Sequence, residues 1–186
     1  MNSKSRIPPL PPALWSEEAH EAYAILDSSA TRDVRAASTL ARVLAHYPKL
    51  GKAFYTFGRH LLLESSLPHR LRELATLRVA WHHKSEYEWY HHARFGKQIG
   101  LSDEEIKAVK QGPEAKIWTR ADRCVLRLTD ELCTRSEVDD ATWHELNEIL
   151  TQHQTMDLVF TVGQSVVTAW VIAAFGFGIE PGFESK

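Results

Sequence analysis

The sequence predicts an all-α protein. Apolar residues recur at three- and four-residue spacing along most of the chain. No stretch of useful length alternates between apolar and polar residues as a half-buried strand would, and no internal repeat is present. Helix stop and start signals divide the apolar stretches, as where Gly100 is followed by Ser102 and Glu105. We therefore expect a bundle of helices.

The composition is that of an ordinary globular protein. Of 186 residues, 44% are hydrophobic and 25% are charged, which suits one domain with a sizeable core. The net charge of −2 provides no basic field for nucleic acid or an anionic membrane, so neither is expected as a partner. No apolar leader segment follows Met1, and we expect a cytoplasmic protein.

The first 14 residues form a separate segment. Four prolines between positions 8 and 12 exclude a regular helix and predict an extended N-terminal arm over residues 1–14. The arm is either disordered or packed on its own subunit or on a neighbour. The remainder, residues 15–186, is expected to form a single domain. Its first helix should cover residues 17–26, with Ser16 as the N-cap.

Two further helices precede the centre of the chain. Apolar residues at helical spacing predict helices over residues 33–46 and 49–64. Pro48 ends the first and can begin the second. The next helix, over residues 69–81, is apolar almost all round and should be central. Glu73 falls on its apolar surface, which predicts a buried or half-buried carboxylate.

The stretch over residues 72–101 is predicted to organise the fold as two helices joined by an elbow at residues 82–84. The second helix, residues 86–99, has one apolar side on a helical wheel. That side comprises Trp89, Phe95, Gly96 and Ile99, with Glu88 and His92 inside it. His91 falls on the polar side. An ionisable pair on a face directed to the core is costly unless it is paired or used.

Helix signals continue to the C-terminus. Ser102 and Glu105 form a capping box, and Gly112-Pro113 closes the short helix that follows. Helices are then expected over residues 118–133, over residues 141–150 with Asp139 or Asp140 as the cap, and over residues 156–175. Polar residues interrupt the last helix, and no second apolar span exists. We therefore expect it to be buried or to lie at a subunit interface rather than to cross a membrane.

The candidate site residues lie in the central stretch. Ser85 and Glu88 fit a capping box, which would give both a structural role. His92 lies two turns into its helix, so a cap does not explain it. Glu88 at i−4 allows a proton-sharing pair with His92, and Glu73 on the adjacent helix is a third candidate. The candidate catalytic residues are Glu73, Glu88 and His92, and the candidate substrate-binding residues are Ser85, Tyr87 and Trp89.

Metal and cofactor chemistry have little support. His82 and His83, like His91 and His92, point about 100° apart on a helix, and no HExxH motif occurs. Nucleotide-binding and hydrolase motifs are absent. Cys124 and Cys133 are nine residues apart, so on one helix they lie about 13 Å apart and cannot form a disulfide. We expect no metal and no cofactor.

Several motifs resemble a known family. They are RELATLRVAW from Arg72, SEYEWYHH from Ser85, GLSDEEI from Gly100 and MDLVFTVGQ from Met156. Together they are similar to the carboxymuconolactone decarboxylase family, which includes the alkylhydroperoxidase AhpD. The resemblance implies an AhpD-like helical bundle with a central helical hairpin. It also implies homo-oligomers, often trimers or hexamers.

The peroxidase branch of this family carries Cys-x-x-Cys-x-x-x-His, with a glutamate twelve residues before the first cysteine. Ser85 and Glu88 occupy the two cysteine positions here, while His92 and Glu73 match the histidine and the glutamate. Both thiols are missing, so no disulfide can close a peroxidase cycle. The resemblance then implies a cofactor-independent lyase of the decarboxylase type, which acts on a small organic acid or lactone by proton transfer. The alternatives are an AhpD-like hydroperoxidase and a non-catalytic homologue that binds a small ligand.

Overall fold

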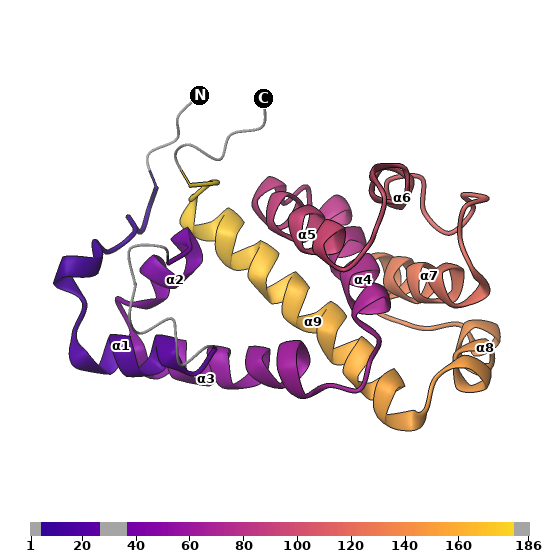
Figure 1. The fold of residues 1–186 in the computed structure, drawn as a ribbon, viewed down its shortest axis with the longest axis horizontal. Helices are drawn as coiled ribbons and strands as arrows, with labels where there is room; N and C mark the ends of the chain where they lie inside the picture. The colour runs from indigo at the N-terminus through magenta and orange to yellow at the C-terminus, as the bar shows by residue number, and fades with distance from the viewer. Residues whose placement is uncertain (1–4, 27–36, 181–186) are drawn as a thin grey trace. The chain divides into compact units, whose positions relative to one another are not determined.

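The structure is a computed structural model and describes residues 5–26 and 37–180. Every regular element in these two ranges is helical, and the all-α prediction is confirmed (Figure 1). Internal contacts divide the chain into two compact units. One combines Met1–Glu64 with Val171–Lys186, and the other is Ser65–Trp170. The expectation of one domain over residues 15–186 stays a prediction.

The first unit contains short helices. In chain order they are a 3₁₀ turn η1 (Pro12–Leu14), α1 (Glu17–Ala24), α2 (Thr39–Leu44), α3 (Pro48–Arg59) and a π-helical turn η4 (His60–Glu64). The Ser16 hydroxyl accepts a hydrogen bond from the Ala19 amide, so the predicted cap of α1 is confirmed. Pro48 begins α3 as expected. The helix predicted over residues 33–46 is shorter, and its first four residues lie outside the described ranges.

The described part of the N-terminal arm packs on its own unit. The Leu10 amide donates to the Arg42 carbonyl at 3.0 Å, and the Arg6 amide donates to the Phe175 carbonyl at 2.8 Å. The Trp15 indole donates to the Leu10 carbonyl at 3.1 Å. These bonds satisfy backbone groups that an extended segment would otherwise leave unpaired. Residues 5–14 therefore pack on their own chain, and the role of the whole arm over residues 1–14 stays a prediction.

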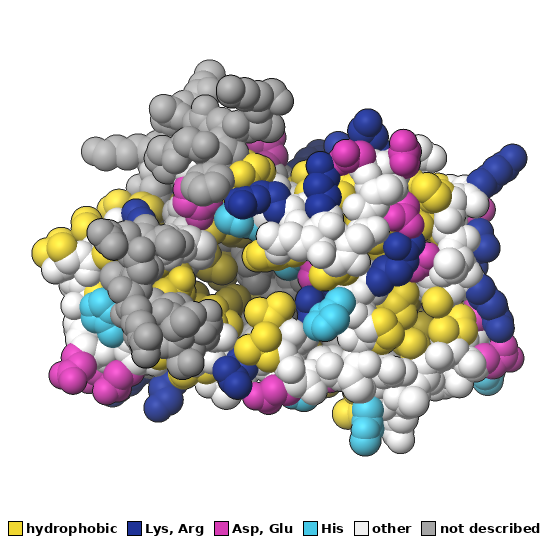
Figure 2. Space-filling model, in the orientation of Figure 1, with side chains coloured by type: hydrophobic (Ala, Val, Ile, Leu, Met, Phe, Trp, Pro, Cys, Tyr) yellow, Lys and Arg dark blue, Asp and Glu magenta, His cyan; other side chains and the backbone are white. Residues whose placement is uncertain are grey.

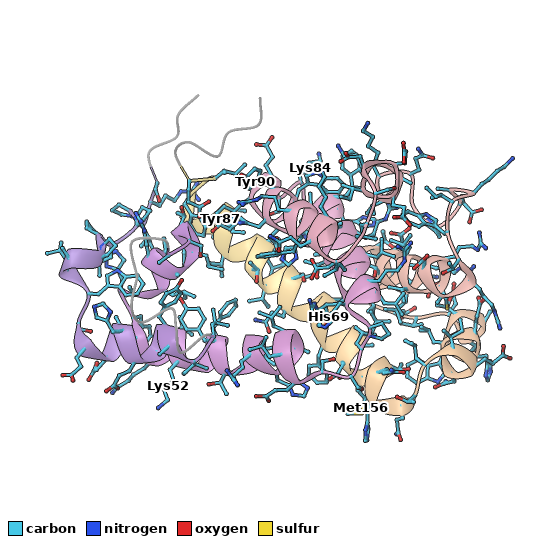
Figure 3. All side chains as sticks on the ribbon, viewed as in Figure 1. Lys52, His69, Lys84, Tyr87, Tyr90 and Met156 are labelled. Carbon is cyan, nitrogen blue, oxygen red and sulfur yellow. The ribbon has the colours of Figure 1, made fainter. Side chains whose placement is uncertain are left out.

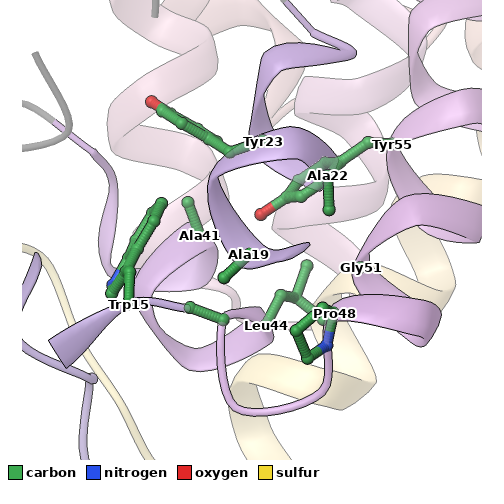
Figure 4. Close-up of a pocket in the computed structure, with 10 residues that line it drawn as sticks. Trp15, Ala19, Ala22, Tyr23, Ala41, Leu44, Pro48, Gly51 and Tyr55 are labelled. Atoms are coloured by element: carbon green, nitrogen blue, oxygen red, sulfur yellow. The ribbon is translucent and has the colours of Figure 1, made fainter. Parts of the chain in front are cut away.

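A small pocket lies in this unit, at the contact of α1, α2 and α3 (Figure 4). Its space of about 170 Å³ includes open solvent. The walls are mostly alanine methyl groups and the rings of Trp15 and Tyr55. The enclosed part is too narrow for a water molecule, so the pocket is a packing seam of the unit's hydrophobic core and has no room for a ligand.

The second unit is built around one central helix. Its elements are α4 (His69–His82), α5 (Glu86–Gln98), α6 (Asp103–Val109), α7 (Arg120–Arg135), α8 (Asp140–Ile149) and α9 (Gln152–Phe175), which continues into the first unit. Helix α4 packs against α5, α6 and α7. Leu74 and Leu77 on α4 are fully buried, which confirms the predicted central position. Trp81, in the last turn of α4, is an exception to this burial, because 44% of its surface is exposed.

The turn between α4 and α5 is one residue later than the predicted elbow. His82 is the last helical residue of α4, and Ser85 precedes α5. Lys84, which is labelled in Figure 3, lies in this turn and adopts a left-handed conformation with φ of 53°. The Ser85 amide donates to the Ala80 carbonyl at 2.9 Å and closes the turn. Helices α4 and α5 therefore form the central hairpin.

The connection from α5 to α6 follows the expected signals. Gly100 has φ of 97°, a conformation that side-chain-bearing residues rarely adopt, and it follows the C-cap Ile99. The Ser102 hydroxyl accepts from the Glu105 amide at 3.1 Å, and the Glu105 carboxylate accepts from the Ser102 amide at 2.8 Å. The predicted capping box is confirmed.

A buried arginine ties α4 to α6 and α7. Arg78, only 8% exposed, donates to the Val109 carbonyl at 2.7 Å and to Asp130 Oδ2 at 2.9 Å. His82 Nε2 lies 2.7 Å from the other oxygen of Asp130. Gly112, with φ of 85°, passes so close that a Cβ there would lie 2.7 Å from Arg78 Nη2. Since a buried charge is stable only when it is paired, this network fixes the positions of the three helices.

Helices α7 and α8 begin close to the expected residues but differ from expectation in how they are capped. Helix α7 begins at Arg120 instead of residue 118, because Thr119 and Asp122 form an unpredicted capping box. Asp139 is the N-cap of α8, as one of the two alternatives predicted, but its side chain makes no capping hydrogen bond.

Helix α9 begins one turn earlier than predicted, at Gln152, and is hydrogen-bonded to the second unit at several points. Ser65 donates to Asp157 at 2.7 Å, and Ser165 donates to Thr76 at 3.3 Å. Within the described residues, α9 is the one helix long and apolar enough to cross a membrane, and 33% of its most apolar stretch is buried.

Candidate functional site

A histidine–carboxylate pair joins the two helices of the central hairpin. His92 Nδ1 on α5 lies 2.7 Å from Glu73 Oε2 on α4. The Glu73 side chain is 1% exposed, whereas that of His92 is 28% exposed. A buried carboxylate bonded to one ring nitrogen fixes the orientation of the imidazole. Two of the three predicted catalytic residues are thus in direct contact.

Glu73 is held as an anion by two partners. Burial alone would raise the pKa of its carboxyl group, but the hydrogen bond and charge of His92 and the charge of Arg72 outweigh this effect and lower the pKa. Arg72 Nε donates to Glu73 Oε1 at 3.1 Å, and the arginine side chain is only 11% exposed. Arg72 was not expected at the site, since adjacent residues point about 100° apart on a helical wheel.

Glu88 is a carboxyl group of the opposite character. It is 3% exposed. Burial raises its pKa to about 7, and His92 and the Ser85 hydroxyl oppose this shift only in part. Oε2 of Glu88 is buried without a hydrogen-bond partner in the described parts of the chain. The site therefore contains one ionised carboxylate, Glu73, and one carboxyl group that can be neutral near pH 7.

The capping-box interpretation of Ser85 and Glu88 is wrong. Ser85 is the N-cap of α5, but its side chain makes no capping hydrogen bond, because its ψ of 89° departs from the geometry seen at Ser102. Ser85 is only 7% exposed, and its hydroxyl makes no well-aligned hydrogen bond among the described residues, although it lies close enough to Glu88 to lower the pKa of that carboxyl group. Buried polar atoms are rarely left unpaired in folded proteins. A structural cap therefore does not account for either residue.

One ring nitrogen of His92 remains available. No described residue forms a hydrogen bond with Nε2, and the ring is partly exposed. The Phe95 ring lies 5.7 Å from the imidazole. Phe95 is 46% and Ile99 41% exposed, so the expectation that these two residues face the core is wrong. Phe95 therefore adds an exposed apolar ring beside the imidazole of His92.

The predicted substrate-binding aromatics make other contacts. Tyr87 is buried, and its ring lies 4.5 Å from that of His91. The Trp89 ring lies 6.2 Å from the Trp81 ring, and Lys110 Nζ lies 4.7 Å above it. The roles of both aromatics in substrate binding stay predictions. His92 is the histidine of this adjacent pair that is hydrogen-bonded to Glu73.

The thiols lie outside this site. Both are on α7, as predicted. Burial raises the pKa of Cys124 and of Cys133 to about 11 in each case. The reactive thiolate form is therefore scarce near neutral pH. As for metal ions, no group of three potential ligands gathers within residues 5–26 and 37–180.

Comparisons with known proteins identify a family match over part of the chain. Residues 48–115, which include α4 and α5, match the model of the Carboxymuconolactone decarboxylase family. None of the curated proteins compared with the chain matches it.

Solved structures extend the similarity to the whole chain. A peroxidase-related protein from Ralstonia eutropha JMP134, described as an alkylhydroperoxidase AhpD core, has 20% identity and a TM-score of 0.80 over 98% of this chain and 96% of its own. A peroxidase-related protein from Silicibacter sp. TM1040 has 16% identity and a TM-score of 0.78, covering 99% and 98%. The debrominase Bmp8 in complex with 2,3,4-tribromopyrrole has 12% identity and a TM-score of 0.80, covering 98% and 96%.

At these identities the structural similarity establishes the fold, and the family match covers the hairpin that carries Glu73 and His92. The chain thus has an AhpD-like all-α fold, and its residues 48–115 match the model of the carboxymuconolactone decarboxylase family.

Proposed function

We propose that the protein is a cofactor-independent lyase of the decarboxylase type, which acts on a small organic acid or lactone by general acid–base catalysis. The observation that carries the proposal is the bond between His92 Nδ1 and Glu73 Oε2, which leaves Nε2 for a substrate. A general acid or base needs this arrangement of one fixed and one available ring nitrogen.

Each residue has a distinct part in this reaction. As the carbon–carbon bond to the leaving carboxylate breaks, its electron pair moves into an adjacent carbonyl and forms an enolate. CO₂ leaves, and His92, which takes up a proton from solvent beforehand, donates that proton from Nε2 to the carbon; the neutral imidazole is then reprotonated by solvent. Glu73 stabilises the imidazolium before transfer. Glu88, with a pKa of about 7, can donate a hydrogen bond to the enolate oxygen while it is neutral.

Unsatisfied polar atoms support a ligand at this position. The Ser85 hydroxyl, at the N-cap of α5, and Glu88 Oε2, in its first turn, are buried, and neither makes a well-aligned hydrogen bond among the described residues. A bound substrate with a donor and an acceptor would satisfy both groups. The exposed rings and methyl groups of Phe95 and Ile99 favour a partly apolar substrate.

Two alternatives predict different results. A thiol peroxidase needs reactive cysteines, and the shifted pKa values of Cys124 and Cys133 argue against it. A non-catalytic homologue would bind a ligand and release it unchanged. Localisation in the cytoplasm and assembly into a homo-oligomer remain part of the proposal.

The test is a screen of unsaturated lactone acids and β-keto acids, with ¹H NMR to follow substrate loss and product formation. Turnover by the parent protein and its loss in His92→Ala would support the lyase. Binding without turnover of any ligand would favour the non-catalytic homologue.

A further inference from the structure

Helix α9 carries a polar row along its otherwise apolar length. The members of the row recur at three- and four-residue spacing, which places them on one side of the helix. They are Asp157, Thr161, Gln164, Ser165 and Thr168. From Met156 onward, every other residue of α9 is apolar or glycine. The whole row belongs to the second compact unit, Ser65–Trp170.

Contacts inside this unit show how the row lies relative to α4. Ser65, just before α4, donates to Asp157 at 2.7 Å. Ser165, two turns further along α9, donates to Thr76 on α4 at 3.3 Å. Because the numbers of both partners rise together, α4 and α9 run parallel, and positions one turn before a contact lie level with each other on the two helices.

On α4, Thr76 marks the border between the hydrophobic core and the candidate site. Val79 belongs to the core of the unit. The helical wheel of α4 runs from Val79 through Thr76 to Glu73. Glu73 is bonded to His92 on α5. The side of α4 beyond Thr76 is therefore the side of the candidate site.

On α9, Ser165 has the matching position. Val162 belongs to the same core, and the wheel of α9 runs from Val162 through Ser165 to Thr161 and Gln164. Because Ser165 touches Thr76, the two borders coincide. The side chains beyond Ser165 on α9 are consequently directed to the side of the candidate site, as a second polar surface in addition to that of α5.

Thr161 and Gln164 carry polar atoms that need a partner. Thr161 Oγ1 and Gln164 Oε1 are buried, and neither makes a hydrogen bond within the described parts of the chain. Thr161 is only 4% exposed. Buried polar atoms are rarely left unpaired, and Ser85 and Glu88 on the α5 side have the same deficit. Unpaired atoms on both α5 and α9 indicate a ligand that lies between them.

We propose that Thr161 and Gln164 bind a hydroxyl group of the substrate, so that the substrate is a hydroxylated lactone or a hydroxylated organic acid. A hydroxyl group donates one hydrogen bond and accepts others, so it can donate to Gln164 Oε1 and accept from the Thr161 hydroxyl. A carboxylate has no proton to donate to an amide oxygen, and α9 has no lysine or arginine to neutralise its charge. The inference rests on the proposed function for the remainder of the substrate, the acid or lactone group at His92.

The surface charge agrees with a substrate of low charge. Among the described residues, Lys and Arg side chains lie interspersed with Asp and Glu side chains on the face in view (Figure 2). No field of one sign on this face would therefore gather a multiply charged substrate. A hydroxylated compound with one acid group or none meets this condition.

The first test compares two probes, γ-butyrolactone and its α-hydroxy derivative, in titrations of the parent protein followed by ligand-observed NMR. The hydroxylated lactone should bind about tenfold more tightly, because the other lactone leaves buried polar atoms unpaired. Thr161→Val and Gln164→Met should each remove most of this preference by weakening the hydroxylated lactone alone. Failure of the parent to bind the hydroxylated lactone, equal affinities for the two lactones, or an unchanged preference in both variants would each overturn the proposal.

Thr129→Val is the matched control. Thr129 is also a fully buried threonine, but its hydroxyl donates to the Val125 carbonyl at 2.8 Å. This variant should lose stability in urea and keep the preference for the hydroxylated lactone. Thr161→Val should keep or gain stability, since it removes a polar atom that has no partner in the protein. A loss of stability as large as that of Thr129→Val would contradict the proposal.

The binding readouts need no turnover, so they separate this inference from the lyase. A parent protein that prefers the hydroxylated lactone but converts no compound of the screen would support the hydroxyl site and contradict the lyase. Turnover that favours substrates without a hydroxyl group over their hydroxylated counterparts would contradict the hydroxyl site and leave the lyase intact.

Discussion

His92 is hydrogen-bonded to Glu73 on the neighbouring helix and not to Glu88, which lies one turn before it on its own helix. The two carboxyl groups consequently have opposite properties: the pKa of Glu73 is lowered and that of Glu88 is raised to about 7. Environments that separate the pKa values of two nearby acids are a common way to assign an acid and a base within one site.

The two adjacent histidines should not be equivalent. His92→Ala should reduce the rate roughly 10²–10⁴-fold, the range for loss of a general acid or base. His91→Ala should have little effect, because His91 packs on Tyr87 and is not bonded to Glu73. Steady-state kinetics on a substrate from the screen measures both. Equal activity of His92→Ala and the parent would exclude the proposed mechanism.

Glu73→Gln tests the anion behind His92. The variant retains the shape of the side chain but loses the charge that stabilises the imidazolium, so kcat should fall roughly 10²-fold with little change in KM. Glu105→Gln is a control on a carboxylate that caps α6 and lies outside the site. A loss of kcat in both variants alike would indicate general damage to the fold.

Glu88 should make stability depend on pH with an unusual sign. Its pKa is raised from 4.5 to about 7, so between these values the folded chain binds more protons than the unfolded chain. Stability from this group is present at low pH and decreases as pH rises from about 4.5 to 7, by about 1–3 kcal/mol. Glu88→Gln, which resembles the neutral acid, should remove this decrease.

Urea unfolding of the parent and Glu88→Gln at about pH 5 and about pH 8 measures the difference. The variant should gain stability over the parent only at the higher pH. Glu86→Gln, on the exposed side of the same turn, is the control. A pH-independent difference between parent and Glu88→Gln would show that Glu88 is not buried as an acid.

No dithiol peroxidase activity is expected. Ser85 and Glu88 occupy the thiol positions of the peroxidase motif, and the pKa of each native cysteine is raised to about 11. A coupled assay with an organic hydroperoxide and a thiol reductant should show no turnover above background. Turnover that is abolished by Cys124→Ser or Cys133→Ser would refute this expectation.

Two glycines with positive φ should differ in their tolerance of alanine. Gly100→Ala should cost about 1 kcal/mol, because only its backbone conformation is strained and nothing lies within 4 Å of the new Cβ. Gly112→Ala should cost about 2–4 kcal/mol, since the new Cβ also displaces the hydrogen-bonded guanidinium of Arg78. Urea denaturation of the two variants compares these costs directly.

The sequence predicts most of the helices because the signals that define them are local. Ser16, Pro48 and Ser102 each begin or cap a helix where expected, since a cap depends on residues within one turn. The same local rule was wrong at Ser85. There the motif is present, but the tight turn through Lys84 gives Ser85 a backbone geometry that does not permit the cap.

The candidate site could be predicted in its members but not in its contacts. The pattern identified Glu73 as buried and placed His92 near Glu88, yet the hydrogen bond to His92 comes from the other helix. Which of two carboxylates binds a histidine depends on how the helices pack, and a helical wheel contains no such information. For the same reason the role of Arg72 was missed, and Phe95 and Ile99 were expected on the wrong side.

The short distance along the chain between Glu73 and His92 also matters for folding. Only 19 residues separate them, and the bond requires no more than closure of the turn between α4 and α5. Contacts between residues close in sequence form quickly, because little chain entropy is lost when the loop closes. We expect this pair to form with the hairpin early in folding, before α9, more than 50 residues further along, packs against the completed core.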